Sequence, residues 1–190
     1  GLNADGVTRN PAYTKLLDVG NLMDYMLGHY WTGERDGMSG QWGLNNYVCA
    51  FNRANPDGFK YFEYDSEASL DMGYANNVGP YVMSTNFSAF CAQTMHQKLV
   101  ENPEYRMAFA DRTYLRMFND GPMTASNAIA SVVKRANEIT NAIIAESARW
   151  GDSLVEPPMT RSNWLAAVQV TTNWMAGRVP VVIGQLRSAG

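Results

Sequence analysis

The segment Asn55-Pro56-Asp57-Gly58 is the sequence feature that most constrains the fold, because it is a strong turn signal between two aromatic-rich runs. Proline fixes φ at a turn position, and Asn, Asp and Gly accept the backbone conformations that tight turns require. The flanking runs, residues 46–52 and 59–65, have the composition of short strands. This part of the chain is therefore predicted to form an antiparallel β-hairpin.

The rest of the chain shows helical periodicity, with apolar residues recurring every three or four positions. Asp18 is suited to cap the first helix, and Pro103 to open the third. The predicted helices cover residues 18–31, 87–100, 103–119, 124–150, 162–175 and 180–187, the fifth capped by Ser162 and the last opened by Pro180. We therefore predict a mainly α (α+β) fold.

The predicted architecture is one helical domain over residues 1–190 with one antiparallel β-hairpin. Residues 1–11 are expected to form a flexible lead-in, residues 32–44 a glycine-rich loop, and residues 66–85 an irregular crossing. A loop with four glycines lets backbone and short polar side chains approach a ligand closely.

The composition excludes several classes of protein. A hydrophobic content of 46% is too high for a disordered chain, and no apolar run approaches the roughly 20 residues of a membrane-spanning helix. The net charge of −3, with 15 scattered Lys and Arg, argues against a nucleic-acid partner. Cys49 and Cys91 allow at most one disulfide and no zinc pattern, so they leave the disulfide state and the compartment open.

Acidic residues are concentrated in one part of the chain. Residues 18–76 hold nine Asp and Glu against three Lys and Arg. Such a segment is either a solvated surface or the surroundings of a cation site, because hard divalent cations take oxygen ligands. Any cation chemistry is therefore expected within residues 18–76.

Three polar residues in this segment are expected to converge at the open end of the predicted hairpin. In a hairpin the second strand runs back alongside the first. Asn45 at the start of the first strand and Asp65 at the end of the second should therefore be neighbours. Asp36 lies in the loop just before Asn45. Two carboxylates and an amide oxygen form an oxygen donor set suited to Mg²⁺ or Mn²⁺. The alternative is that these are ordinary turn and capping residues.

Several segments together resemble a known family. They are DYMLGHYWTGERDG, LNNYVCAFNR, FKYFEYDSEASL, ENPEYRMAFADRTYLRMFNDGPMT, IIAESARWGD, NWLAAV and QLR. Their order and spacing resemble the carboxy-terminal two-thirds of the spore coat protein H (CotH) kinase family, over nearly the whole chain. The resemblance implies a fold like the C-terminal lobe of an atypical protein kinase, and ATP-dependent phosphate transfer to a protein hydroxyl.

The resemblance also assigns roles to individual residues. Asp36 would be the catalytic aspartate that orients the acceptor hydroxyl, and Asp65 the principal metal ligand. Asn45 would be a second ligand, with Asn46 as the alternative and Glu67 as a weaker candidate. The implied cofactors are Mg²⁺ or Mn²⁺ with ATP.

The sequence departs from the family pattern in two places. Residues 37–44 replace the usual Trp-Pro-His before the Asn pair, which changes the spacing from Asp36 to Asn45. A kinase also needs an amino-terminal lobe with a phosphate-binding Lys, and Lys15 is the sole Lys before the first predicted helix. We therefore expect the N-terminal nucleotide lobe to be a missing partner, the chain to be inactive alone, and its exposed cleft face to favour a homo-oligomer.

Two further questions stay open at this level. His29 is either a base near Asp36 or a hydrogen-bonded structural residue, and His96 has no visible partner in the sequence. The second function class is a non-catalytic structural or interaction module of a bacterial surface or coat protein. The sequence names no protein substrate and no location.

Overall fold

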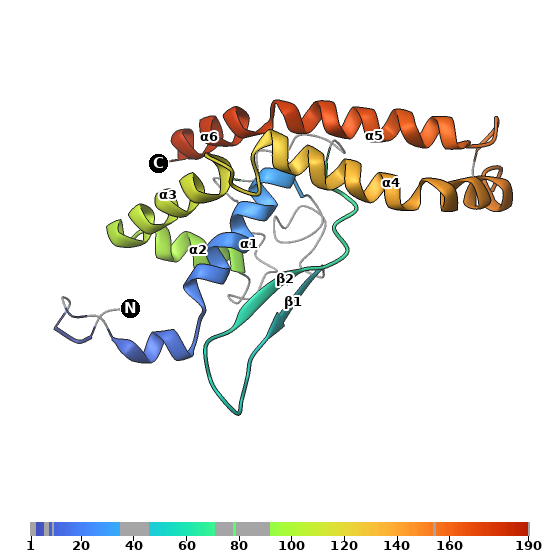
Figure 1. The fold of residues 1–190 in the computed structure, drawn as a ribbon. Coiled ribbons are helices and arrows are strands. Elements are labelled where there is room, and N and C mark those ends of the chain that lie inside the picture. The colour runs from blue at the N-terminus through green and yellow to red at the C-terminus, as the bar shows by residue number, and fades with distance from the viewer. Residues whose placement is uncertain are drawn as a thin grey trace. The chain divides into compact units, whose positions relative to one another are not determined.

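The computed structural model describes residues 3–5, 8, 10–34, 46–70, 78, 92–153 and 155–189 (Figure 1). These residues are mainly helical, with one two-stranded antiparallel sheet. The predicted fold class is therefore confirmed. The chain forms two compact units, Gly1–Tyr114 and Leu115–Ser188. The prediction of a single domain over residues 1–190 stays a prediction.

The first unit contains the hairpin and the helices on either side of it in the sequence. Its elements are the 3-10 helix η1 (Pro11–Lys15), α1 (Val19–Thr32), β1 (Tyr47–Ala50), β2 (Lys60–Glu63), α2 (Ala92–Val100) and most of α3 (Pro103–Met117). Parts of the predicted 32–44 loop, of the 66–85 crossing and of the 87–100 helix lie outside the described residues.

Helix α1 begins and ends as the sequence predicts. The Asp18 carboxylate accepts a hydrogen bond from the backbone N–H of Asn21 at 2.9 Å and so satisfies a donor of the first turn. Gly33 ends the helix in the left-handed conformation at φ 68°, which glycine adopts without a Cβ clash.

The hairpin is also confirmed. Tyr47 lies opposite Glu63 and Ala50 opposite Lys60 in an antiparallel ladder. Gly58 takes φ 96° in the connection, and a Cβ there would lie 2.4 Å from the backbone nitrogen of Asp18. Only glycine fits where the connection meets the chain that enters α1.

The core of the first unit is built on the apolar face of α1. Leu22, Met26, Leu27 and Tyr30 are at most 1% exposed. The ring of Tyr30 lies 5.8 Å from that of His96 on α2 and 6.5 Å from that of Phe109 on α3, both edge-on. Aromatic packing therefore joins α1, α2 and α3.

The second unit contains α4 (Ala125–Trp150), α5 (Arg161–Ala176) and α6 (Arg178–Ala189). Helices α4 and α5 run side by side over much of their length (Figure 1). Thr124 is the N-cap residue of α4, at the position where the sequence predicts this helix to start. No described helix is both long enough and apolar enough to cross a membrane.

Two predicted helix starts are wrong by two residues. Helix α5 is capped by Thr160 and not by Ser162, because Thr160 and Asn163 exchange side-chain and backbone hydrogen bonds in a capping box. Helix α6 begins at Arg178, which places Pro180 third in the helix. Proline is tolerated there because the first-turn N–H groups have no intrahelical acceptor.

Candidate active site

The predicted site residues divide into two groups. Asp36 and Asn45 lie outside the described residues, so their convergence with Asp65 stays a prediction. Asn46, Asp65 and Glu67 are described. Within the described ranges, no three His, Cys, Asp or Glu side chains form a group that could hold a metal ion.

Asn46 and Asp65 lie at the open end of the hairpin. Asn46 directly precedes β1 and is 8% exposed, whereas Asp65 follows β2 by two residues and is exposed. Asp65 has φ 55°, a left-handed conformation that aspartate tolerates better than most residues. The exposed carboxylate therefore sits on a sharp bend of the backbone, at residues 63–66, here called the Asp65 bend.

Helix α1 and the chain entering it hold β2, and Phe59 just before it, through hydrogen bonds to the backbone of these residues. The Phe59 N–H donates to the Leu16 carbonyl at 3.0 Å, and the Asp18 N–H donates to the Phe59 carbonyl at 3.1 Å. Farther along, the Asn21 amide binds both backbone groups of Tyr61, accepting from its N–H at 2.6 Å and donating to its carbonyl at 3.1 Å. These bonds fix the position of β2 along α1.

Two turns after Asn21, His29 contacts the side chain that begins the Asp65 bend. Its Nε2 lies 3.1 Å from Oε2 of Glu63, and its side chain is 3% exposed against 43% for Glu63. The carboxylate lies off the direction of the ring N–H, so this is a close polar contact and not an aligned hydrogen bond. The same Oε2 accepts a hydrogen bond from the Ser66 hydroxyl at 3.2 Å.

The chain after the bend returns to α1. The Leu70 N–H donates to the carbonyl of Thr32, in the last turn of α1, at 2.9 Å. The Ser69 hydroxyl donates to the Ser66 carbonyl at 2.7 Å. Asp65 is thus flanked by two attachments to the C-terminal end of α1, one at Glu63 and one at Leu70.

Tyr25 lies one helical turn before His29 and is also buried. Burial raises the pKa of its hydroxyl, and the nearby carboxylates of Glu63 and Glu34 raise it further. Its ring meets that of His29 edge-on at 4.5 Å. In the part of the chain that the structure describes, the Tyr25 hydroxyl makes no hydrogen bond. The C-terminal half of α1 therefore carries two buried polar side chains, Tyr25 and His29, at positions where apolar residues are usual.

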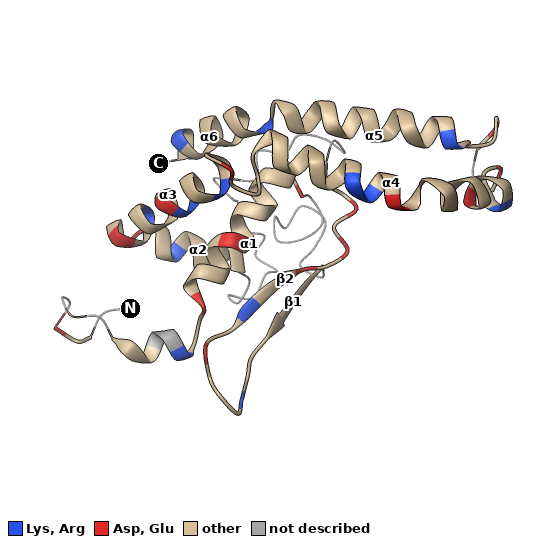
Figure 2. Ribbon diagram, in the orientation of Figure 1, with Lys and Arg blue, Asp and Glu red and all other residues tan. Residues whose placement is uncertain are grey.

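The charges around the hairpin are partly paired. Figure 2 shows acidic positions on α1 and along β2 and the segment after it. The Lys60 ammonium lies 2.5 Å from Asp57 and 3.6 Å from Asp18. The hydrogen bond between Lys60 and Asp57 lowers the pKa of Asp57, and the same bond raises the pKa of Lys60.

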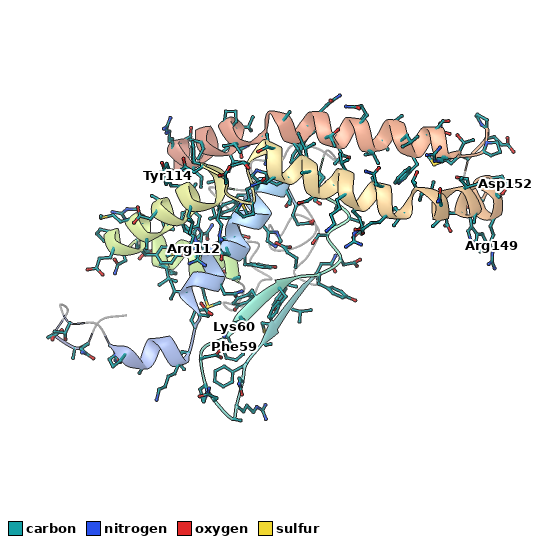
Figure 3. The ribbon with its side chains drawn as sticks, in the orientation of Figure 1. Phe59, Lys60, Arg112, Tyr114, Arg149 and Asp152 are labelled. Atoms are coloured by element: carbon teal, nitrogen blue, oxygen red, sulfur yellow. The ribbon has the colours of Figure 1, made fainter. Side chains whose placement is uncertain are left out.

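A second ion pair joins α1 to α3 away from the hairpin. Arg112 of α3, labelled in Figure 3, donates to both carboxylate oxygens of Asp24, at 2.8 and 2.5 Å. The hydrogen bond to Asp24 raises the pKa of Arg112. This bidentate contact is strong and geometrically specific.

The donor chemistry at the open end fits a hard cation such as Mg²⁺. The exposed Asp65 carboxylate offers oxygen ligands, which Mg²⁺ prefers. The buried Asn46 amide is less accessible than Asp65. Asp65 is therefore an accessible carboxylate at this end of the hairpin, and its role as a cation ligand stays a prediction.

Sequence reasoning missed the contacts that hold the bend. Asn21, His29 and Ser66 were not expected to act together, because Asn21 is 40 positions from its partner Tyr61 and His29 is 34 positions from Glu63 in the sequence. One signal was available: Asn21, Tyr25 and His29 recur every four residues, which places polar groups on one side of an otherwise apolar helix.

The comparisons with known proteins give one match. The family model described as CotH kinase protein matches residues 3–182, which is most of the chain. No curated protein and no solved structure matches significantly.

Proposed function

The chain belongs to the CotH kinase family, and from this premise we propose that it acts as an atypical protein kinase that transfers phosphate from ATP to a protein hydroxyl. The family match carries the proposal. In this reaction the acceptor oxygen bonds to the γ-phosphorus while the bond from that phosphorus to the β,γ-bridging oxygen breaks, so that ADP leaves.

The proposed roles follow the family pattern. Asp36 orients the acceptor hydroxyl and takes its proton, and Asp65 is the principal ligand of Mg²⁺ or Mn²⁺. Asn45 is the proposed second ligand, and Asn46, which is 8% exposed, is the alternative. Glu67, also exposed, is a weaker candidate. The cation would neutralise charge on the ATP phosphates.

One structural observation supports this assignment. Asp65 is exposed on a sharp bend at the open end of the hairpin, next to the strand that follows Asn45 in the sequence.

Calorimetry with Mn²⁺ and ATP tests the proposal. We expect the wild-type chain to bind Mn²⁺ with ATP, Asp65→Asn to abolish the binding, and Asp36→Asn to retain it, because Asp36 is assigned to the acceptor hydroxyl and not to the cation. Glu101→Gln, an exposed acid near the end of α2, is the matched charge control and should bind normally.

The alternative function is a non-catalytic interaction module. The same calorimetry distinguishes it from the kinase. Large apolar side chains remain exposed on α4 and α5, including Ile144, Trp150 and Val170. An absence of Mn²⁺ and ATP binding in the wild type, with no difference in Asp65→Asn, would favour the interaction module.

A further inference from the structure

The described residue that links α1 most directly to the Asp65 bend is His29. It is 2% exposed and reaches Glu63 from one turn before the end of α1. Burying an imidazole beside a carboxylate removes both groups from part of their hydration, a cost that an apolar residue at this position would not carry. A buried histidine in this place calls for a role beyond filling space.

Glu63 carries the contact with His29 across the bend. Its Oε2 meets His29 on one side and accepts the Ser66 hydroxyl on the other, so that one carboxylate oxygen joins α1 to the residue after Asp65. Asp65 lies between Glu63 and Ser66 in the chain. The position of the Glu63 carboxylate therefore limits the paths that the Asp65 backbone can take.

The fit between α1 and Glu63 is close. A Cβ at Gly28 would lie 3.0 Å from Oε1 of Glu63, so a side chain at residue 28 would crowd the carboxylate and push it aside by a few tenths of an ångström. Beyond the bend, the Thr32 carbonyl holds the N–H of Leu70. The last turn and a half of α1 thus contacts the chain before and after Asp65.

We propose that His29 is a positioning residue for the cation site at Asp65, acting through Glu63 and Ser66. This inference rests on the proposed function, because it concerns the ligand assigned there. His29 does not touch the cation. It holds the Asp65 bend in one shape, so that the carboxylate meets the cation without first having to be ordered.

The test is the affinity for Mn²⁺ alone, measured by calorimetry beside the thermal stability of each variant. His29→Leu keeps an apolar volume but loses the polar contact, and we expect about 10-fold weaker binding, the lower end of what losing a residue that orients a ligand costs. His29→Gln keeps a polar nitrogen near the Nε2 position and should restore most of the affinity.

Two further variants separate positioning from general destabilisation. Asp24→Asn breaks the Arg112 pair, which also fastens α1 but does not touch the hairpin. It should lower the melting temperature and leave Mn²⁺ affinity unchanged. Ser66→Ala removes the other partner of Glu63 at a half-buried position and should weaken Mn²⁺ binding while the chain stays folded.

Each outcome decides the question. Unchanged affinity in His29→Leu and Ser66→Ala, or an equal loss in Asp24→Asn, overturns the positioning role while leaving the proposed function in place. A wild-type chain that binds Mn²⁺ only together with ATP overturns the positioning role, and one that binds Mn²⁺ neither alone nor with ATP overturns the proposed function as well. If His29→Leu does not fold, the Mn²⁺ affinities of Ser66→Ala and His29→Gln are compared with that of the wild type instead.

Discussion

The two histidines of the chain are both buried, but their surroundings are chemically opposite. His29 lies beside the Glu63 carboxylate, whereas the His96 ring packs among the rings of Tyr30, Tyr105 and Phe109. The one polar contact of His96 in the described chain is its Nδ1, 2.8 Å from the Tyr105 hydroxyl. An aromatic environment favours a neutral imidazole, so His96 acts as a packing residue whose ring contacts the Tyr105 hydroxyl.

Burial of His96 predicts a loss of stability in mild acid. Desolvation lowers the pKa of His96 from 6.5 to about 4. Between these values the unfolded chain binds a proton that the folded chain does not, so stability falls as the pH drops from about 7 toward 4. The total loss is about 3 kcal/mol, at about 1.4 kcal/mol for each unit of pKa difference. Urea denaturation between pH 7 and pH 4.5 measures it.

His96→Gln is the control for this prediction. Glutamine can still bond the Tyr105 hydroxyl but does not titrate, so the variant should be less stable than the wild type at pH 7 and should show a flatter pH dependence. The difference in unfolding free energy between the two proteins should shrink as the pH falls. A difference that stays constant from pH 7 to pH 4.5 would show that another group causes the acid effect.

Among the elements, α1 uses two different faces for two different tasks. Leu22, Met26 and Leu27 supply the apolar core. Asn21 and His29 contact Tyr61 and Glu63, the second and the last residue of β2. Positions four and eight apart lie on one side of a helix. The helix therefore supports the fold on one face and the candidate site on another.

Helix α5 yields a prediction about its cap. Thr160→Ala removes the side chain that accepts from the Asn163 N–H and should destabilise the chain by about 1 kcal/mol. Ser162→Ala lies one residue inside the helix start, at an exposed position, and should change stability by less than about 0.5 kcal/mol. Chemical denaturation of both variants measures the contrast. A larger loss in Ser162→Ala would mean that the helix starts later in solution.

Local signals explain which elements could be predicted from the sequence. The cap at Asp18, the proline at 103 and the Asn-Pro-Asp-Gly turn act on neighbouring residues, and the elements they predict are present. The start of α5 was misplaced because Thr160 and Ser162 are both good caps, and the side chain of Asn163 decides between them.

The site could be predicted only in part, for a different physical reason. The open end of a hairpin follows from its topology, so the positions of Asn46 and Asp65 were foreseeable. The contact of His29 with Glu63 depends on how α1 packs against β2, which a local pattern does not encode. The meeting of Asp36 and Asn45 with Asp65 stays a prediction.

On the scale of the whole molecule, the candidate chemistry and the long helices belong to different units. Asp65, Glu63 and His29 are all in Gly1–Tyr114, which also contains the whole acidic segment, residues 18–76. The second unit carries exposed apolar residues on its helices, including Val133, Ile139 and Leu165. A cation bound at Asp65 should therefore act first on the unit that contains α1 and the hairpin.

Hydrogen exchange with bound ligand tests this division of roles. A ligand at 100 times its dissociation constant stabilises the binding-competent state by about 2.7 kcal/mol. With Mn²⁺ and ATP at that excess, we expect slower exchange in peptides covering residues 16–32 and 59–70, because the attachments on both sides of Asp65 lie there. Peptides from α4 and α5 should exchange at their original rates. Asp65→Asn should remove the protection, and protection confined to residues 125–176 would place the ligand in the other unit.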